Sequence, residues 1–152
     1  MKIDAVDIRI LNELQADGSL TNLELAKRVH LSPSPCLTRV KALENDGVID
    51  RYVALVQPKS LGLNLSVFIS ISLKEQSKSA LAAFEKSIAD HDEIMECYLM
   101  TGPRDYLLRV VVPDLIAYEQ FIKQKLTRLD GLASIESSFA LDQIKYSVAL
   151  PL

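Results

Sequence analysis

The sequence predicts an α+β protein in which an N-terminal winged helix-turn-helix is followed by a ferredoxin-like βαββαβ domain. Two observations predict this class. Residues 21–47 contain two short helical patterns around a tight break, and the residues after 64 alternate between strand and helix patterns. These boundaries give domains at residues 1–56 and 65–152, joined by a linker at residues 57–64 where the composition changes.

The first two helices are expected over residues 4–17 and from Thr21 to about residue 29. Thr21 and Glu24 form a T-x-x-E capping box, in which each side chain satisfies a backbone N–H group of the other residue. Gly18 ends the first helix. Apolar residues recur at helical spacing in both segments and give three helices a shared core: Ile3, Val6, Ile10, Leu11, Leu14, Leu25, Ala26 and Val29.

A third helix is expected from Ser34, its N-cap, and Pro35, its first helical residue, to about Asn45. One side of this helix is apolar (Leu37, Val40 and Leu43), and the other carries Ser34, Thr38, Arg39, Lys41, Ala42 and Asn45. Hydroxyl groups and cations suit phosphate oxygens, and Arg and Asn also address base edges in the major groove. The pattern predicts a DNA-reading helix. The alternative is an ordinary amphipathic helix with a solvated face.

Residues 48–55 indicate a short two-stranded wing, in which Arg51 and Tyr52 contact the DNA backbone. Alternatively, Tyr52 only covers the small core. Between residues 21 and 43, four cations face a single acidic residue, Glu24, so the local surface is basic. The expected DNA-binding residues are Thr21, Asn22, Lys27, Arg28, Ser32, Ser34, Pro35, Thr38, Arg39, Lys41 and Arg51.

The net charge of −3 limits how tightly one copy holds DNA. Residues 1–64 carry eight cations and eight anions, whereas residues 65–152 carry nine cations and twelve anions. A basic patch on a neutral domain supports moderate affinity but not strong non-specific binding. We therefore expect a homodimer that binds paired half-sites in double-stranded DNA.

The sequence disfavours several other classes of protein. No apolar run is long enough to span a bilayer, and the N-terminus has no signal-peptide pattern. Cys36 and Cys97 have no metal-ligand spacing, and we expect both to be reduced, buried or half-buried residues of a cytoplasmic protein. The chain has no phosphate-binding loop, nucleophile motif or paired carboxylates, so we expect no enzyme, metal or cofactor.

The second domain is expected to contain four strands and two helices. Val67, Ile69, Ile71 and Leu73 alternate with other residues, as in a strand with one buried face. The remaining elements are helix 79–89, strands 94–101 and 105–112 around the turn 102–104, helix 115–129, strand 134–141, and an edge strand or arm at 144–150. The apolar third strand, residues 106–112, lacks the aromatic signature of an RNA-binding sheet.

Several motifs connect the chain to a known family. They are Asp7–Leu11, Leu14-Gln15, Leu31–Leu37, Arg39-Val40, Leu43-Glu44, Tyr52, Glu96-Cys97, Thr101-Gly102, Asp105–Leu108 and Val112–Asp114. With these residues the chain resembles the Lrp/AsnC, or feast/famine, transcription regulators over nearly its whole length. The resemblance implies a winged helix for DNA and a ferredoxin-like domain for dimerisation, assembly into octamers and amino-acid sensing. The chain departs from the family in lacking a long basic N-terminal tail and in having Pro103-Arg104 in the turn.

The resemblance places an amino-acid effector between subunits, near the Gly-x-x-Asp-Tyr turn. A free amino acid carries an ammonium and a carboxylate, so its pocket needs an anion and N–H donors. Asp105 offers the anion, and Gly102 allows a close approach to the backbone. The expected effector-binding residues are Met100, Gly102, Pro103, Arg104, Asp105, Tyr106, Leu115, Ser134, Ser137 and Ser138, with the serines facing the pocket from a neighbouring subunit. Alternatively, Asp105 is only a turn residue and the serines face solvent.

The sequence therefore predicts a DNA-binding transcription regulator that responds to an amino acid. Met100, Tyr106 and Leu115 offer an apolar wall, which favours leucine or methionine. Arg104 complicates this choice, because a cation beside the site favours an acidic or amide side chain. The alternative is an amino-acid-binding sensor without sequence-specific DNA activity, which would have no use for the first 55 residues.

Overall fold

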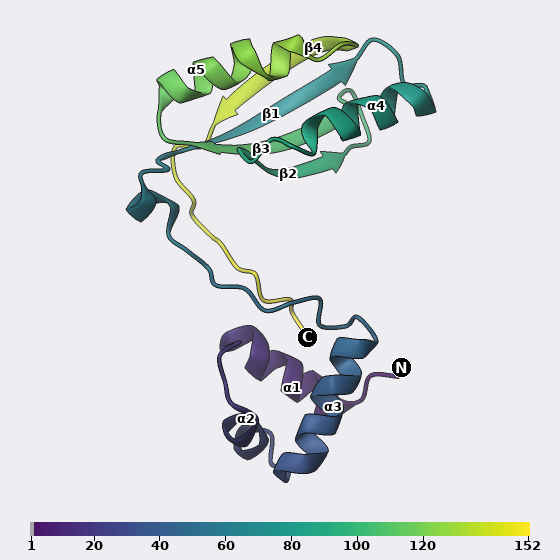
Figure 1. Ribbon diagram of the computed structural model, residues 1–152, viewed down its shortest axis with the longest axis vertical. Helices are drawn as coiled ribbons and strands as arrows, with labels where there is room; N and C mark the ends of the chain where they lie inside the picture. Colours follow the sequence, from purple (N-terminus) through teal and green to yellow (C-terminus); the bar gives the residue numbers. More distant parts are fainter. Residues whose placement is uncertain (1) are drawn as a thin grey trace. The chain divides into compact units, whose positions relative to one another are not determined.

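The computed structural model describes residues 2–152, which form two compact units (Figure 1). The first unit contains the residues up to Leu55 together with Ile144–Leu152, and the second contains Val56–Gln143. The sequence pattern assigns residues 144–152 to the second domain, whereas their contacts group them with the first unit. Of the two alternatives expected for residues 144–150, an edge strand or an arm, the structure shows the arm.

Three helices form the first unit: α1 (Ala5–Ala16), α2 (Asn22–Arg28) and α3 (Pro33–Asn45). The capping box of α2 is present, because the Thr21 N–H group donates to Glu24 Oε2 at 2.8 Å and the Glu24 N–H group donates to Thr21 Oγ1 at 3.3 Å. A second capping box at α1, between Asp4 and Asp7, was not predicted. The core of the unit consists of Ile10, Leu25, Ala26, Val29, Cys36 and Leu43.

The predicted start of α3 is wrong by two residues. Ser32 is the N-cap and Pro33 is the first helical residue, and the first helical hydrogen bond runs from Cys36 N–H to Ser32 O at 3.2 Å. Ser32 has an extended backbone, as the residue before a proline prefers. Pro35 is tolerated inside the first turn because N–H groups there have no helical partner.

The predicted pairing of residues 48–55 as two strands is also wrong. The Val48 and Ile49 N–H groups instead donate to Leu43 O at 2.9 and 3.1 Å and close the end of α3. The following residues are extended and exposed, and no described residue pairs with them in a strand ladder. Tyr52 lies at the edge of the core, where its hydroxyl donates to Glu44 Oε1 at 3.0 Å.

The second unit contains β1 (Leu65–Leu73), α4 (Lys78–Ile88), β2 (Ile94–Leu99), β3 (Tyr106–Val112), α5 (Leu115–Gln124) and β4 (Leu132–Phe139). Short 3₁₀ helices at Pro58–Leu61 and Leu126–Arg128 precede β1 and follow α5. All pairings are antiparallel in the order β2-β3-β1-β4, and both helices cover one face of the sheet (Figure 1). The ferredoxin-like prediction is therefore confirmed, although β4 begins and ends two residues earlier than expected and the second helix is shorter.

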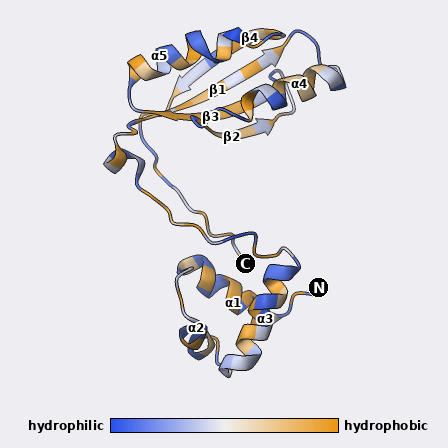
Figure 2. Cartoon of the chain, in the orientation of Figure 1, coloured by the Kyte–Doolittle hydropathy of each residue, from blue (hydrophilic) through white to orange (hydrophobic). Residues whose placement is uncertain are grey.

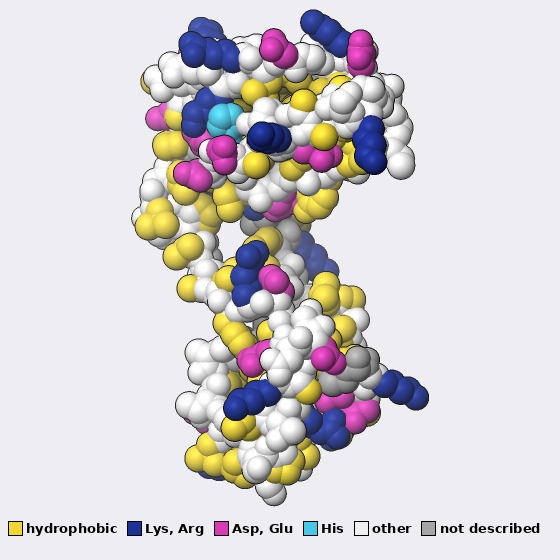
Figure 3. Space-filling view, turned by 45° about the vertical axis from the view of Figure 1, so that its right-hand side comes forward, with side chains coloured by type: hydrophobic (Ala, Val, Ile, Leu, Met, Phe, Trp, Pro, Cys, Tyr) yellow, Lys and Arg dark blue, Asp and Glu magenta, His cyan; other side chains and the backbone are white. Residues whose placement is uncertain are grey.

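The strands contain both hydrophobic and hydrophilic residues (Figure 2), and the strand register separates them onto two faces of different composition. The face under α4 and α5 is apolar and contains Val67, Ile69, Ile71, Tyr106, Leu108 and Val110, packed against Phe84, Phe121 and Leu126. The alternate residues form the opposite face, which no helix within residues 2–152 covers and which includes Phe68, Ser70, Leu107, Arg109, Glu136 and Ser138. Figure 3 shows basic and acidic side chains interspersed over the visible face of this unit, with hydrophobic side chains exposed between them.

The two cysteines of the chain differ in burial. Cys36 is fully buried in the first core, but Cys97 on β2 is exposed, so the prediction of burial is wrong for Cys97. Within residues 2–152, no cluster of His, Cys, Asp or Glu side chains is arranged to hold a metal ion. No helix in the same range is long and apolar enough to cross a membrane.

Candidate functional site

The exposed side of α3 begins with the sequence Pro-Ser-Pro. Pro33 and Pro35 have no N–H group, so the first turn offers few backbone donors to a phosphate. The side chains of Ser32 and Ser34 are exposed there, and Ser32 makes no capping hydrogen bond. Thr38, one turn later, donates its hydroxyl proton to Ser34 O at 3.1 Å and is left as an acceptor. This end of α3 therefore presents hydroxyl groups rather than backbone donors.

Asn22, a predicted DNA contact, is the first residue of α2, and its side chain reaches the start of α3. Its Nδ2 donates to Pro33 O at 2.9 Å, which fixes the start of α3 against the start of α2. Its Oδ1 is buried without a hydrogen-bond partner. The geometry makes Asn22 a residue that positions α3.

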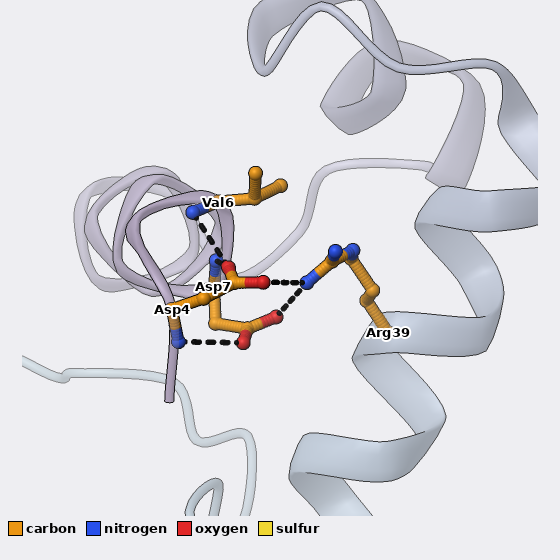
Figure 4. A network of polar contacts seen from close by, with 4 residues as sticks. All are labelled: Asp4, Val6, Asp7 and Arg39. Atoms are coloured by element: carbon orange, nitrogen blue, oxygen red, sulfur yellow. Dashed lines mark hydrogen bonds and ion pairs between the residues drawn. The ribbon is translucent and has the colours of Figure 1, made fainter. Parts of the chain in front are cut away.

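Arg39 does not extend into solvent as the helical wheel predicted. Its Nη1 lies 2.8 Å from Asp4 Oδ2 and 2.8 Å from Asp7 Oδ1, both at the start of α1 (Figure 4). The Asp7 side chain is only 4% exposed, so Arg39 neutralises a buried carboxylate. The helical wheel did not predict this pairing, because Asp7 lies 32 residues earlier in the chain and does not appear on a wheel drawn for α3, while the Arg39 side chain stays 36% exposed.

The other predicted cations differ in their availability. Lys27 and Lys41 are exposed, and neither forms an ion pair with a described residue. Arg28 pairs with Glu13 at 3.1 Å, and Arg51 pairs with Asp50 at 3.3 Å while remaining exposed. The cations most available to phosphate on α2 and α3 are therefore Lys27 and Lys41.

The predicted effector turn joins β2 to β3. Gly102 has a φ of +109°, a conformation that other residues rarely adopt. Asp105 Oδ2 accepts the Leu73 N–H group at 2.7 Å, and the Asp105 N–H group donates to Ile71 O at 2.8 Å. Asp105 thus fixes the turn to the end of β1, and the half-buried carboxylate keeps one oxygen for which no intrachain partner is seen among the described residues.

Arg104 and Glu136 form an ion pair beside this turn, with Arg104 Nη2 2.5 Å from Glu136 Oε2. Their side chains are partly exposed. The pair neutralises the cation that had favoured an acidic or amide effector. The remaining charge at the turn is the carboxylate of Asp105.

Tyr106 and Ser137 were predicted to face the effector, but both side chains lie on the helix side of the sheet. Tyr106 is 1% exposed, and its hydroxyl donates to Glu85 Oε1 at 2.7 Å. Burial, followed by the hydrogen bond to Glu85, raises the pKa of Tyr106 above its usual range. Ser137 shares a hydrogen bond with the hydroxyl of Tyr118 on α5. The strand register directs Tyr106 into the core and Ser137 toward α5, although Ser137 stays exposed, so neither side chain lies on the uncovered face of the sheet.

The strand register also separates the remaining predicted residues. Ser134 pairs with Ser72 and lies at the same end of β1 as Asp105, whereas Ser138 pairs with Phe68 farther along the strand. Leu115 follows β3, so it lies about 20 Å from the Gly102 turn, the length of a seven-residue strand. Within one chain Leu115 does not reach the Gly102 turn, so its place in the effector wall stays a prediction for a site shared between subunits.

A separate cavity of about 360 Å³ lies between α4 and β2. It is lined by Glu85, Ile88, Ala89, Ile94, Met95, Glu96, Cys97, Leu99 and Tyr106. Of the predicted effector residues it includes Tyr106 alone. One chain therefore contributes the turn around Asp105 but does not enclose it with the other predicted residues.

Sequence matches identify the two units. Residues 66–150 match the family described as Lrp/AsnC ligand binding domain. The chain belongs to the Lrp/AsnC family. Residues 3–50 match the winged helix-turn-helix DNA-binding family, so this Lrp/AsnC protein has the two domains of an Lrp-like DNA-binding transcription regulator.

Relatives of this Lrp/AsnC protein cover almost its whole length. The leucine-responsive regulatory protein of Klebsiella pneumoniae is 41% identical over 145 residues, which are 95% of this chain and 88% of the relative. The L-Met complex of a transcriptional regulator from Neisseria meningitidis is 41% identical, with a TM-score of 0.94, and the match covers 99% of this chain and 97% of the other. An AsnC family transcriptional regulator from Agrobacterium tumefaciens is 42% identical, with a TM-score of 0.93 and coverage of 98% and 97%.

The sequence reasoning missed the structural roles of Asp4, Asp7 and Gln15, although Asp7 and Gln15 belong to the motifs that carry the family resemblance. The spacing Asp4-x-x-Asp7 at the start of a predicted helix is that of a capping box, which a local search detects. The ion pair to Arg39 and the contacts of Gln15 join residues far apart in sequence, and no local pattern marks them.

Proposed function

We propose that this Lrp/AsnC protein binds specific double-stranded DNA sites and that methionine or leucine, bound at the turn around Gly102 and Asp105, controls that binding. The observation that carries the choice of effector is the Arg104–Glu136 ion pair, because it leaves Asp105 as the charge beside a turn with an exposed Met100. An anion suits the effector's ammonium, and an apolar surface suits an aliphatic side chain. The likeness to an L-Met complex and to leucine-responsive proteins supports the same class.

The proposed effector site is completed by a second subunit. Two surfaces of the second unit that carry accessible hydrophobic side chains support assembly: the uncovered sheet face with Phe68 and Leu107, and the edge strand β2 with Met95, Tyr98 and Leu99. One surface suffices for a homodimer, and a second surface allows homodimers to join into an octamer.

The proposed DNA contacts follow the exposed residues of the helix-turn-helix. Lys27 and Lys41 bind phosphates, Ser32, Ser34 and Thr38 approach the major groove with their hydroxyl groups, and Thr21, Arg28 and Arg51 lie at the margins. Pro35 limits the backbone donors of the first turn. Asn22 and Arg39 position α3 and do not themselves contact DNA.

A thermal-shift screen of the full chain against the twenty amino acids tests the sensing function. We expect methionine or leucine to raise the melting temperature at millimolar concentration, since a ligand that binds the folded state stabilises it. DNA fragments selected from a random library then serve in gel-shift titrations with and without that amino acid. Selection of no sequence above background would leave the protein as an amino-acid sensor without sequence-specific DNA activity.

A further inference from the structure

The C-terminal segment lies against the first unit, although it follows the second unit in the chain. The match to the ligand-binding family extends to residue 150, yet the contacts of Ile144–Leu152 place this segment with α1, α2 and α3. Within the first unit, Figure 1 shows the segment beside the extended residues that follow α3. The first unit is therefore built from two separate stretches of chain.

A groove of about 540 Å³ lies between this segment and the rest of the first unit, and the segment forms one side of it. Leu11, Leu14 and Gly18 form one wall, and Tyr52, Val53 and Leu55 form another. The segment contributes Val148, Leu150 and Leu152, which are alternate residues, as expected when one face of an extended chain is directed into a groove. The intervening Ala149 is exposed and does not line the groove.

Gln15 of α1 binds the backbone of this segment at one residue. Its Oε1 accepts the Leu150 N–H group at 2.6 Å, and its Nε2 donates to Leu150 O at 3.2 Å. A carboxamide has one donor side and one acceptor side, so it pairs with a single residue as a neighbouring strand does. Gln15 thus recognises an extended backbone, and the apolar walls recognise its side chains.

The contact is suited to reversible release. Val148, Leu150 and Leu152 are still 52%, 66% and 51% exposed, so the groove removes only part of their surface from water. Both hydrogen bonds are solvent-exposed, which limits their net strength. A segment held this weakly exchanges between seated and released states.

We propose that residues 146–152 form a releasable strap by which the ligand-binding domain holds α1 in the position needed for DNA reading. The strap binds α1 through Gln15, and α1 holds α3 through the ion pairs of Asp4 and Asp7 with Arg39. Seating of the strap therefore stabilises the relative position of the two helices that set the reading surface. This inference rests on the proposed function for its DNA component, whereas seating of the strap is measurable without DNA.

The test compares two neighbouring substitutions in the full chain, Leu150→Asp and Ala149→Asp. Both add the same charge to the strap, but only Leu150 lines the groove. We expect Leu150→Asp to weaken operator binding about tenfold relative to Ala149→Asp, the change that follows from losing about 1.4 kcal/mol of a coupled contact. Methionine binding in a calorimeter should be the same for both variants. Equal operator affinities of the two variants would overturn the proposal.

Hydrogen exchange of the Leu150 amide measures strap seating directly. In the unaltered protein this amide should exchange more slowly than the amides of residues 141–146, because it donates to Gln15. Gln15→Ala should remove the protection while leaving that of the α3 amides near Leu43 intact. An unprotected Leu150 amide in the unaltered protein would overturn the strap whatever the DNA result. Protection of this amide in a protein that binds no DNA would instead show that the proposed function alone is wrong.

Discussion

Arg39 of α3 joins two carboxylates of α1 through a single nitrogen, and the more important partner is Asp7, whose Oδ1 lies 2.8 Å from Arg39 Nη1 (Figure 4). Asp7 also accepts the Asp4 N–H group at 3.0 Å as part of the capping box of α1. A buried carboxylate is costly unless it is paired and hydrogen-bonded, and Asp7 meets both conditions. The start of α1 and the middle of α3 are therefore fixed to each other by charge as well as by packing.

Replacement of Arg39 should lower the free energy of unfolding of the first unit. Arg39→Ala leaves the carboxylate of Asp7 buried without its cation, and we expect a loss of about 2 kcal/mol in the free energy of unfolding. Asp7→Asn in the same chain should recover part of that loss, because the uncompensated charge is gone. Urea denaturation followed by circular dichroism measures all four members of the cycle. Unchanged stability with reduced DNA affinity would instead place Arg39 on the DNA.

Acid should weaken the same contact through Asp4. The hydrogen bond from the Asp7 N–H group, followed by the Arg39 guanidinium, lowers the pKa of Asp4 from its ordinary value to about 2. A carboxyl group with a lowered folded-state pKa stabilises the fold above its unfolded pKa, and that stabilisation is lost as the pH falls through the folded pKa. We expect the stability difference between the unaltered chain and Asp4→Asn to shrink between pH 4 and pH 2. A difference that stays constant over this range would contradict the assignment.

Lys41 should contribute a phosphate contact without contributing to the fold. It is exposed on α3 and forms no ion pair with any residue from 2 to 152. Lys41→Ala should weaken binding to all DNA sequences similarly and reduce the slope of log K against log salt by about 1. Gel shifts at several salt concentrations measure the slope, and Lys86→Ala on α4 is the matched control. A loss confined to one operator sequence would indicate base reading instead.

The sheet was predictable from sequence because its signal is local. Alternation from Val67 to Leu73 marks a strand with one buried face, and the succession of elements selects the ferredoxin-like order. The capping box of Thr21 and Glu24 was predictable for the same reason. The start of α3 was not, because Ser32-Pro33 and Ser34-Pro35 satisfy the same local rule and only the path of the preceding chain distinguishes them.

The site was less predictable because its geometry depends on distant partners. Arg39 points toward Asp7 across the helix pair, and a wheel of α3 contains no trace of that carboxylate. Leu115 and Asp105 are ten residues apart in sequence, but an intervening strand separates them by its full length. The sequence pattern of residues 48–55 indicates an extended backbone. It does not indicate whether a second strand lies beside that backbone, and a wing forms only where two strands pair.

Asp105 should provide the charge that binds the effector's ammonium. Asp105→Asn keeps an oxygen to accept the Leu73 N–H group and removes only the charge. We expect methionine affinity to fall at least about tenfold while the melting temperature without methionine changes little. Calorimetric titration measures the affinity, and Asp90→Asn, an exposed change outside the turn, is the control. Unchanged methionine binding would leave Asp105 as a turn residue only.

Glu136 should set the preference between apolar and acidic effectors. Glu136→Gln removes the carboxylate that neutralises Arg104 and leaves a guanidinium beside the Gly102 turn. Because both side chains are partly exposed, the loss of the ion pair should change stability by no more than about 1 kcal/mol. The ratio of affinities for glutamate and methionine should therefore rise in the variant, as calorimetric titrations with both amino acids would measure. Glu119→Gln breaks a comparable exposed pair with Lys123 on α5 and should leave the ratio unchanged. An unaltered ratio in Glu136→Gln would place Arg104 outside the effector site.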